Sequence, residues 1–227
     1  MTVPVIAIDG PSASGKGTIA SRVADSLDFH YLESGALYRL VALESLRTGV
    51  RDEASLTQVA KHLPVSFHNE RIILADQDVT DAIRSEDVGV RASEVAPLPA
   101  VRRALLERQR LFRQPPGLVA DGRDMGTTVF PDAFLKVFLT ASPGKRAERR
   151  HKQLIDKGES VSLRALVKDI RARDERDRTR AVSPLVAAED SVRVDSTGMS
   201  IEAVLEEVLQ RWNSLKDRNH QVAPATK

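Results

Sequence analysis

The sequence predicts an α/β fold in which a five-stranded parallel sheet is flanked by helices. Five short apolar segments have the β-branched character of buried strands, at residues 3–8, 29–32, 118–120, 135–139 and 191–194. Segments with helical periodicity separate them, and 227 residues suit a single domain with small insertions. Because strands that alternate with helices pair in parallel, we expect helices on both faces of the sheet.

The first half of the chain begins with the strand at 3–8, a glycine-bearing loop and a helix from about residue 18 to 27. After the strand at 29–32, Ser34 is expected to cap the next helix, which should end at Gly49.

The region that follows changes character twice. Residues 64–80 contain three short strand-like runs around polar turns, which predicts a small antiparallel insertion. Residues 86–114 return to helical periodicity, with interruptions at Pro97 and Pro99.

The second half is mainly helical between its strands. Helices are expected at 143–157, 162–178 and 200–215, and the last residues, 216–227, are expected to fray.

Composition excludes several classes of protein. Cysteine is absent, so no disulfide framework or thiolate metal site exists, which fits a reducing cytoplasm. No signal peptide or membrane span is recognisable. The net charge of +2 argues against general binding to nucleic acids. Arginines outnumber lysines, however, and cluster between Arg102 and Arg180; the guanidinium group is the better partner for phosphate oxygens.

The strongest motif lies between the first strand and the first helix and matches G-x-x-x-x-G-K. It reads Gly10, Pro11, Ser12, Ala13, Ser14, Gly15, Lys16, Gly17 and Thr18. A strand before the motif and a helix after it are the context of a phosphate-binding P-loop. Glycines let backbone N–H groups surround a polyphosphate, the helix dipole adds positive potential, and Lys16 reaches the transferred phosphate.

Gly17 stands where most P-loops place serine or threonine. We therefore expect no direct protein ligand for Mg²⁺, which would rest on phosphate oxygens and water. Thr18 and Asp121 are the candidates for an indirect contact.

Two further groups of residues suggest a second anion site. Ser34 and Arg39 lie at the start of the second helix. Asp121, Arg123 and Asp124 follow the third strand, at the edge where open α/β sheets bind ligands. Either group alone is also compatible with an ordinary helix cap or an Arg–Asp turn.

The segment 173–180 is dense in alternating charge. Arg173, Asp177 and Arg180 share one face if the segment is helical. Charge alone favours a solvated face with surface ion pairs. The basic stretch around Arg149 has the composition of a lid that excludes water during phosphate transfer.

Taken together, these motifs resemble those of the bacterial cytidylate kinases over nearly the whole chain. Four runs carry the resemblance, at residues 8–18, 33–39, 120–127 and 173–178. The Gly17 departure is itself usual among nucleoside monophosphate kinases. The resemblance implies a core at 1–33, 115–148 and 181–215, a monophosphate-binding region at 34–114, and a lid with its following helix at 149–180.

The resemblance also implies roles for individual side chains. Ser34, Arg39, Arg123 and Arg180 would bind the acceptor phosphate. Ser93, Arg102 and Asp124 would contact cytosine, with Arg173 and Asp177 near the base or ribose, and Arg149 would contact ATP. Lys16, Arg123 and Arg180 would act in catalysis. Uracil lacks the amino group that Asp124 would accept from, so UMP should bind less well.

The expected activity is direct in-line transfer of the γ-phosphoryl group of ATP to CMP or dCMP, with Mg²⁺, by a cytoplasmic monomer that binds neither nucleic acid nor membrane. Three alternatives stay open at this point. They are a kinase of another acceptor such as UMP, AMP or shikimate, a nucleotide switch without an acceptor, and a protein that binds nucleic acid through its arginines.

Overall fold

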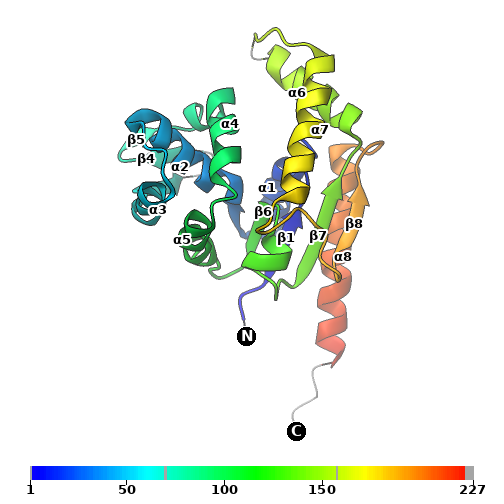
Figure 1. The fold of residues 1–227 in the computed structure, drawn as a ribbon. Coiled ribbons are helices and arrows are strands. Elements are labelled where there is room, and N and C mark those ends of the chain that lie inside the picture. Colours follow the sequence, from blue (N-terminus) through cyan, green and yellow to red (C-terminus); the bar gives the residue numbers. More distant parts are fainter. Residues whose placement is uncertain (1, 69–70, 157, 223–227) are drawn as a thin grey trace. The chain divides into compact units, whose positions relative to one another are not determined.

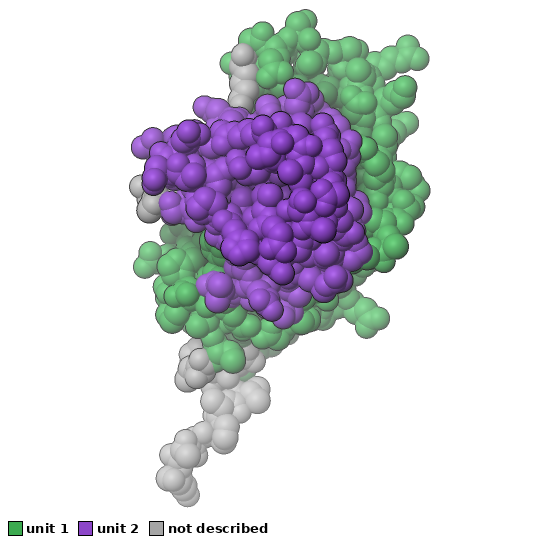
Figure 2. Space-filling view, turned by 60° about the vertical axis from the view of Figure 1, so that its left-hand side comes forward, with its two compact units in different colours: residues 1–32, 112–227 green, residues 33–111 purple. Residues whose placement is uncertain are grey.

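The computed structural model describes residues 2–68, 71–156 and 158–222 of the chain (Figure 1). The chain divides into two compact units, coloured separately in Figure 2. The core unit comprises residues 1–32 and 112–227, and the insert unit comprises residues 33–111. Each unit is described by itself.

A five-stranded sheet forms the centre of the core unit. Its strand order is β2 (His30–Glu33), β6 (Leu118–Gly122), β1 (Val5–Asp9), β7 (Leu135–Thr140) and β8 (Val192–Asp195). β1 pairs in parallel with both β6 and β7, and β7 pairs in parallel with β8. All five expected strands are present, and the predicted parallel α/β fold is correct.

Two helices from opposite ends of the chain cover one face of this sheet. α1 (Lys16–Leu27) and α8 (Ile201–Val222) bury apolar side chains against Ile6 and Ile8 of β1 and their neighbours. Trp212 of α8 meets the rings of Phe29 and Phe134 edge-on, with centroids 5.4 Å and 4.9 Å apart. This packing fixes β1, and with it the start of the loop that follows.

Three further elements complete the core unit. A π-helical turn, η2 (Met125–Val129), follows β6, and its N–H groups bond five residues back, as Phe130 does to Met125. α6 (Pro143–Asp156) and α7 (Leu163–Thr179) pack against each other after β7.

The insert unit combines helices with the expected antiparallel sheet. β3 (Val65–His68), β4 (Arg71–Leu74) and β5 (Gln77–Asp78) form that sheet in this order. A 3₁₀ turn, η1 (Ala82–Arg84), leads to the helices that follow. The last strand is found one residue before the expected run at 78–80.

In the described part of the insert unit, residues 33–68 and 71–111, there are also four α-helices, namely α2 (Ser34–Thr48), α3 (Glu53–His62), α4 (Glu86–Val95) and α5 (Pro99–Arg110). Pro99 stands at the first position of α5, where a missing N–H costs nothing, so the predicted break between α4 and α5 is confirmed. α2 packs against α4, and α3 against α5.

Three local expectations need correction. Ser34 does not cap α2, because β2 passes directly into the helix; Glu33 stands at the cap and Ser34 is the first helical residue. α3 was not anticipated, although the Asp52 side chain caps it by accepting from the Ser55 N–H at 2.9 Å. Residues 216–222 continue α8, because neither glycine nor proline occurs before Pro224; the rest of the expected frayed tail lies outside the described residues.

Candidate nucleotide-binding site

The loop that joins β1 to α1 leaves the sheet at its carboxyl edge. β1 lies between β6 and β7, and ligands of open α/β sheets bind where the chain leaves such a strand. The first bond of α1 runs from the Ile19 N–H to the Gly15 carbonyl, so the N–H groups of the first turn have no acceptor within the helix. Lys16 is partly buried in this turn, and Thr18 is exposed. The residues of the predicted P-loop are therefore contiguous around one helix N-terminus.

Two glycines are required by the path of this loop. A Cβ atom on Gly10 would overlap the carbonyl oxygen of Leu139 on the neighbouring strand β7. Gly15 has a φ of 90° immediately before α1, and Ala13 is also left-handed at 58°. Successive residues of alternating handedness turn their N–H groups toward one centre, which is how such loops bind anions.

Arg149 on α6 contacts the backbone of the loop. Its Nη1 donates to the Ser14 carbonyl at 3.0 Å and its Nη2 donates to the Ser196 carbonyl at 2.7 Å. Ser196 follows β8 and is buried, and its hydroxyl lies within bonding distance of the carbonyls of Ser14 and Thr140. Arg149, predicted to contact ATP, thus binds the backbone of the P-loop in the core unit.

Arg146, one turn earlier on α6, makes a second contact with the loop. It donates to the carbonyls of Ser12 at 3.2 Å and of Ala141 at 2.8 Å, and it pairs with Asp174 of α7. Sequence reasoning did not single it out. The available signal was its spacing of three from Arg149, which places both guanidinium groups on one helical face.

Arg123 joins the P-loop to α7. Its Nη2 donates to the Ser12 hydroxyl at 2.8 Å, and its Nε donates to the Asp177 carboxylate at 2.9 Å. Burial alone would raise the pKa of Asp177, but the charges of Arg123, Arg173 and Arg180 outweigh it and hold that pKa below its usual value. Asp177 therefore stays ionised at neutral pH, surrounded by cations.

The charged run at 173–180 divides into two faces. Arg173, Asp174 and Asp177 are partly buried toward the loop, whereas Glu175 and Arg178 form an exposed surface ion pair at 2.8 Å. Arg180 lies just beyond the helix, and its Nε donates to the Ser183 carbonyl. One side of α7 therefore fits the interpretation as part of a binding site, and the other side fits the interpretation as a solvated face with surface ion pairs.

Asp121 ends the apolar part of β6 and is buried. Its Oδ2 accepts a hydrogen bond from the Tyr31 hydroxyl at 2.6 Å, and a Cβ atom on Gly17 would come within 3.5 Å of the same oxygen. The carboxylate is therefore adjacent to the first turn of α1. Tyr31 was not anticipated as its partner.

Asp9, the last residue of β1, is almost completely buried. It accepts from the N–H groups of Met125 and Gly126 at 2.8 Å each. Burial raises the pKa of Asp9 to about 6, although the two hydrogen bonds oppose that rise, and nearby Asp124 contributes to it. Sequence reasoning gave Asp9 no role, although a carboxylate closing an apolar strand directly before Gly10 was a visible signal.

In the insert unit the expected acceptor residues lie on α2, α4 and α5. The guanidinium group of Arg39 donates to the Ile83 carbonyl at 2.8 Å and lies beside Gly89, whose carbonyl accepts from the Ser93 hydroxyl at 3.0 Å. Arg102 is buried and stacks over the ring of Tyr38 at 5.5 Å. Ser34 is buried at the first position of α2.

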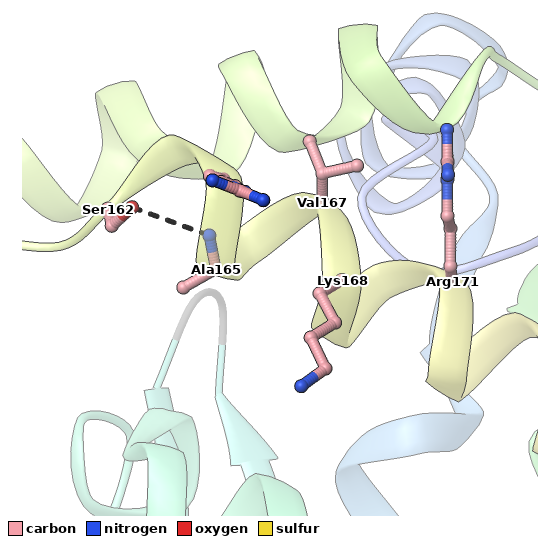
Figure 3. Close-up of a pocket in the computed structure, with 6 residues that line it drawn as sticks. Ser162, Ala165, Val167, Lys168 and Arg171 are labelled. Carbon is pink, nitrogen blue, oxygen red and sulfur yellow. Dashed lines mark hydrogen bonds between the residues drawn. The ribbon is translucent and has the colours of Figure 1, made fainter.

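An open groove of about 580 Å³ follows one side of α7 (Figure 3). Ser162, Ala165 and Val167 contribute to its lining, together with three basic side chains, Arg164, Lys168 and Arg171. None of these six residues belongs to the predicted site. A phosphate site made of backbone N–H groups at a helix N-terminus, as predicted for residues 10–17, need not form a deep cavity.

The described residues contain neither a cluster of metal ligands nor a membrane-spanning helix. Within 2–68, 71–156 and 158–222, no group of three or more His, Cys, Asp or Glu side chains is arranged to hold a metal ion. In the same part of the chain, no helix has both the length and the apolar character that crossing a membrane requires.

Comparison with known proteins identifies the family. The family profile described as cytidylate kinase matches residues 6–214. The chain belongs to the cytidylate kinase family. It is 56% identical to a cytidylate kinase of Pseudomonas aeruginosa over 216 residues, which are 92% of this chain and 94% of that protein. It is 53% identical to a cytidylate kinase of Chromobacterium violaceum, over 97% of this chain and all of the relative.

The fold is also found in a kinase outside the cytidylate kinase family. A crystal structure of a gluconokinase from Sinorhizobium meliloti superposes with a TM-score of 0.51 and 16% identity, covering 97% of this chain and 98% of that one. At this level of identity the likeness concerns the fold alone. The resemblance drawn from the motifs to the cytidylate kinases is confirmed by the family match and the relatives.

Proposed function

We propose that this protein phosphorylates CMP and dCMP with ATP, producing CDP and dCDP, as an enzyme of the cytidylate kinase family. The observation that carries the proposal is the position of Arg123. Its guanidinium group lies between Ser12 of the P-loop and Asp177 of α7, so a cation of phosphate-binding type adjoins the loop that binds a polyphosphate. The match to the cytidylate kinase family favours an acceptor kinase over a nucleotide switch, in which an arginine beside the P-loop would serve hydrolysis instead.

The donor would be ATP held by the loop of residues 10–18. N–H groups around the start of α1 would bind the β- and γ-phosphates, and Lys16 would follow the charge of the transferred group. The contact of Arg149 with the P-loop backbone supports this proposal, because its hydrogen bond to the Ser14 carbonyl stabilises the shape of the loop.

The resemblance to cytidylate kinases assigns the following residues to the acceptor. Ser34, Arg39, Arg123 and Arg180 would bind the phosphate of CMP. Ser93, Arg102 and Asp124 would contact the cytosine, and Arg173 and Asp177 would contact the base or the ribose. The grouping of Arg39 and Ser93 beside Gly89 supports the part of this assignment that falls in the insert unit.

Magnesium fits the residues at the carboxyl edge. Asp121 supplies a buried oxygen next to the first turn of α1, and Thr18 supplies an exposed hydroxyl, so both would contact the ion through water. When bound with ATP, Mg²⁺ neutralises charge on the phosphate oxygens.

The protein's part in the reaction would be mainly to hold two anions together. The acceptor phosphate carries negative charge at neutral pH, so no strong general base is needed. Lys16, Arg123 and Arg180 would offset the repulsion between donor and acceptor and stabilise the charge that spreads over the transferred phosphoryl group. We further propose that the enzyme acts as a cytoplasmic monomer, without nucleic acid or membrane partners.

The test is ADP production from ATP and Mg²⁺ with CMP, dCMP, UMP, AMP, dTMP and shikimate offered separately. The proposal predicts high turnover with CMP and dCMP and little with the others. High turnover with another acceptor would still show a kinase, but it would refute the assignment of cytosine as the base that the enzyme recognises. No acceptor-dependent turnover with any of the six would refute the proposed activity.

A further inference from the structure

The carboxylate of Asp9 is bonded to the π-helical turn that follows β6. Its two oxygens accept separately from Met125 N–H and Gly126 N–H, both at 2.8 Å. These are the first two N–H groups of η2, and helix geometry leaves such groups without acceptors of their own. Asp9 therefore performs from a different strand the capping that Asp124, the residue before the turn, does not perform with its own side chain.

The turn is also confined sterically at Gly126. A Cβ atom on Gly126 would come within 3.2 Å of the Lys136 side chain and 3.5 Å of the Asp9 carboxylate. Lys136 is itself buried and fixed by an ion pair with Asp190 at 2.8 Å. The beginning of η2 is thus packed closely against two charged side chains and has little freedom to shift.

The residues placed by this arrangement are the ones proposed to recognise the acceptor. Asp124 stands directly before η2, and its carbonyl accepts from the N–H groups of Thr128 and Val129. Arg123 precedes it. On the other side, Asp9 is followed at once by Gly10 of the P-loop. One buried carboxylate therefore links the backbone of the donor loop to the backbone of the proposed base-reading residue.

We infer that Asp9 is a positioning residue for cytosine specificity, acting through Asp124. The inference rests on the proposed function, in which Asp124 accepts from the cytosine amino group. A hydrogen bond that discriminates cytosine from uracil depends on the acceptor lying within a few tenths of an ångström of its place. If Asp9 holds that place, weakening its bonds must affect the choice of base more than the binding of ATP.

The experiment compares kcat/KM for CMP and for UMP in the full-length chain. In Asp9→Asn the side chain keeps one acceptor but turns an NH₂ group toward the other backbone N–H. We expect the ratio of kcat/KM for CMP over UMP to fall on the order of tenfold. The KM for ATP should stay close to that of the wild type.

Asp195→Asn is the matched control. Asp195 also ends a core strand and accepts a backbone N–H of the following loop, from Thr197 at 2.9 Å, but its strand β8 lies at the edge of the sheet, separated from β1 by β7. Its substitution should leave the CMP:UMP ratio unchanged.

A double-mutant cycle with Asp124→Ala separates this inference from the proposed function. Asp124→Ala alone should lower the ratio, and adding Asp9→Asn should lower it no further. If Asp124→Ala leaves the ratio unchanged, the base assignment fails and this inference fails with it. If Asp124→Ala lowers the ratio and Asp9→Asn does not, or if the two effects add independently, the proposed function stands and the role of Asp9 is refuted.

A second variant covers the case in which Asp9→Asn does not fold. Gly126→Ala keeps the Asp9 carboxylate and displaces the turn slightly through its contact with Lys136. It should lower the same ratio, by less than Asp9→Asn, while the KM for ATP is retained. An unchanged ratio in a folded Gly126→Ala protein would contradict the inference.

Discussion

Arg146 and Asp174 form a two-pronged ion pair between α6 and α7, with 2.9 Å between Nη1 and Oδ1 and a second contact between Nη2 and Oδ2. Only 3% of the Arg146 side chain is exposed, and 17% of that of Asp174. The same guanidinium group donates to the Ser12 carbonyl of the P-loop. The two helices and the loop therefore share one buried cation.

Removing the anion of this pair should be costly. Asp174→Ala leaves Arg146 buried without its counter-charge, and such a loss destabilises proteins by about 3 kcal/mol. Urea unfolding measures the effect. Glu175→Ala on the same helix removes an exposed pair with Arg178 and should cost about 0.5 kcal/mol or less. Equal effects of the two substitutions would show that the Arg146 pair contributes no more than a surface contact.

The path of the P-loop predicts a sharp difference between two glycines. In Gly10→Ala the new Cβ meets the Leu139 carbonyl, which belongs to the central sheet and cannot move aside, so the loop must be displaced. We expect destabilisation of about 3 kcal/mol and a large loss of ATP binding, measured by unfolding and by calorimetry.

Gly144→Ala is the matched substitution. Gly144 lies in the first turn of α6 with no heavy atom within 4 Å of its Cβ position, so alanine should stabilise the protein by about 0.5 kcal/mol. Retention of ATP binding in Gly10→Ala would contradict the steric argument.

These residues also illustrate what the sequence could predict. The strands and the P-loop were predictable, because β-branched runs, helical spacing and the G-x-x-x-x-G-K pattern are local features. The contact of Arg146 with Ser12 joins residues far apart in the chain, so the spacing of Arg146 from Arg149 indicated a shared helical face but not which part of the fold that face contacts. The bonds from Met125 and Gly126 to Asp9 depend on the register of β1 beside β6, which likewise only the folded sheet defines.

Arg123→Lys tests whether the forked group at this position matters. Arginine donates here in two directions, from Nε to Asp177 and from Nη2 to Ser12. A lysine ammonium keeps the charge but cannot reproduce that planar geometry. We expect kcat/KM for CMP to fall about 100-fold with little change in stability. Arg178→Lys, on the exposed face of α7, is the control and should retain activity.

The pH dependence of stability tests the environment of Asp9. Burial raises the pKa of its carboxyl group to about 6 in the folded protein, from the ordinary value of 3.8 that applies in the unfolded chain. Between these values the folded state binds more protons than the unfolded state, so stability must fall as pH rises from about 4 to 6 and then level off.

Comparison with Asp9→Asn isolates this contribution from the other titrating groups. The free energy of unfolding of the wild type, minus that of Asp9→Asn, should be larger at pH 5 than at pH 7.5 by about 1 kcal/mol. Denaturant unfolding at the two pH values gives both differences. A difference that grows toward pH 7.5 would mean that the two backbone N–H groups of Met125 and Gly126 outweigh burial and lower the pKa of Asp9, because a depressed pKa loses its stabilisation only as pH falls.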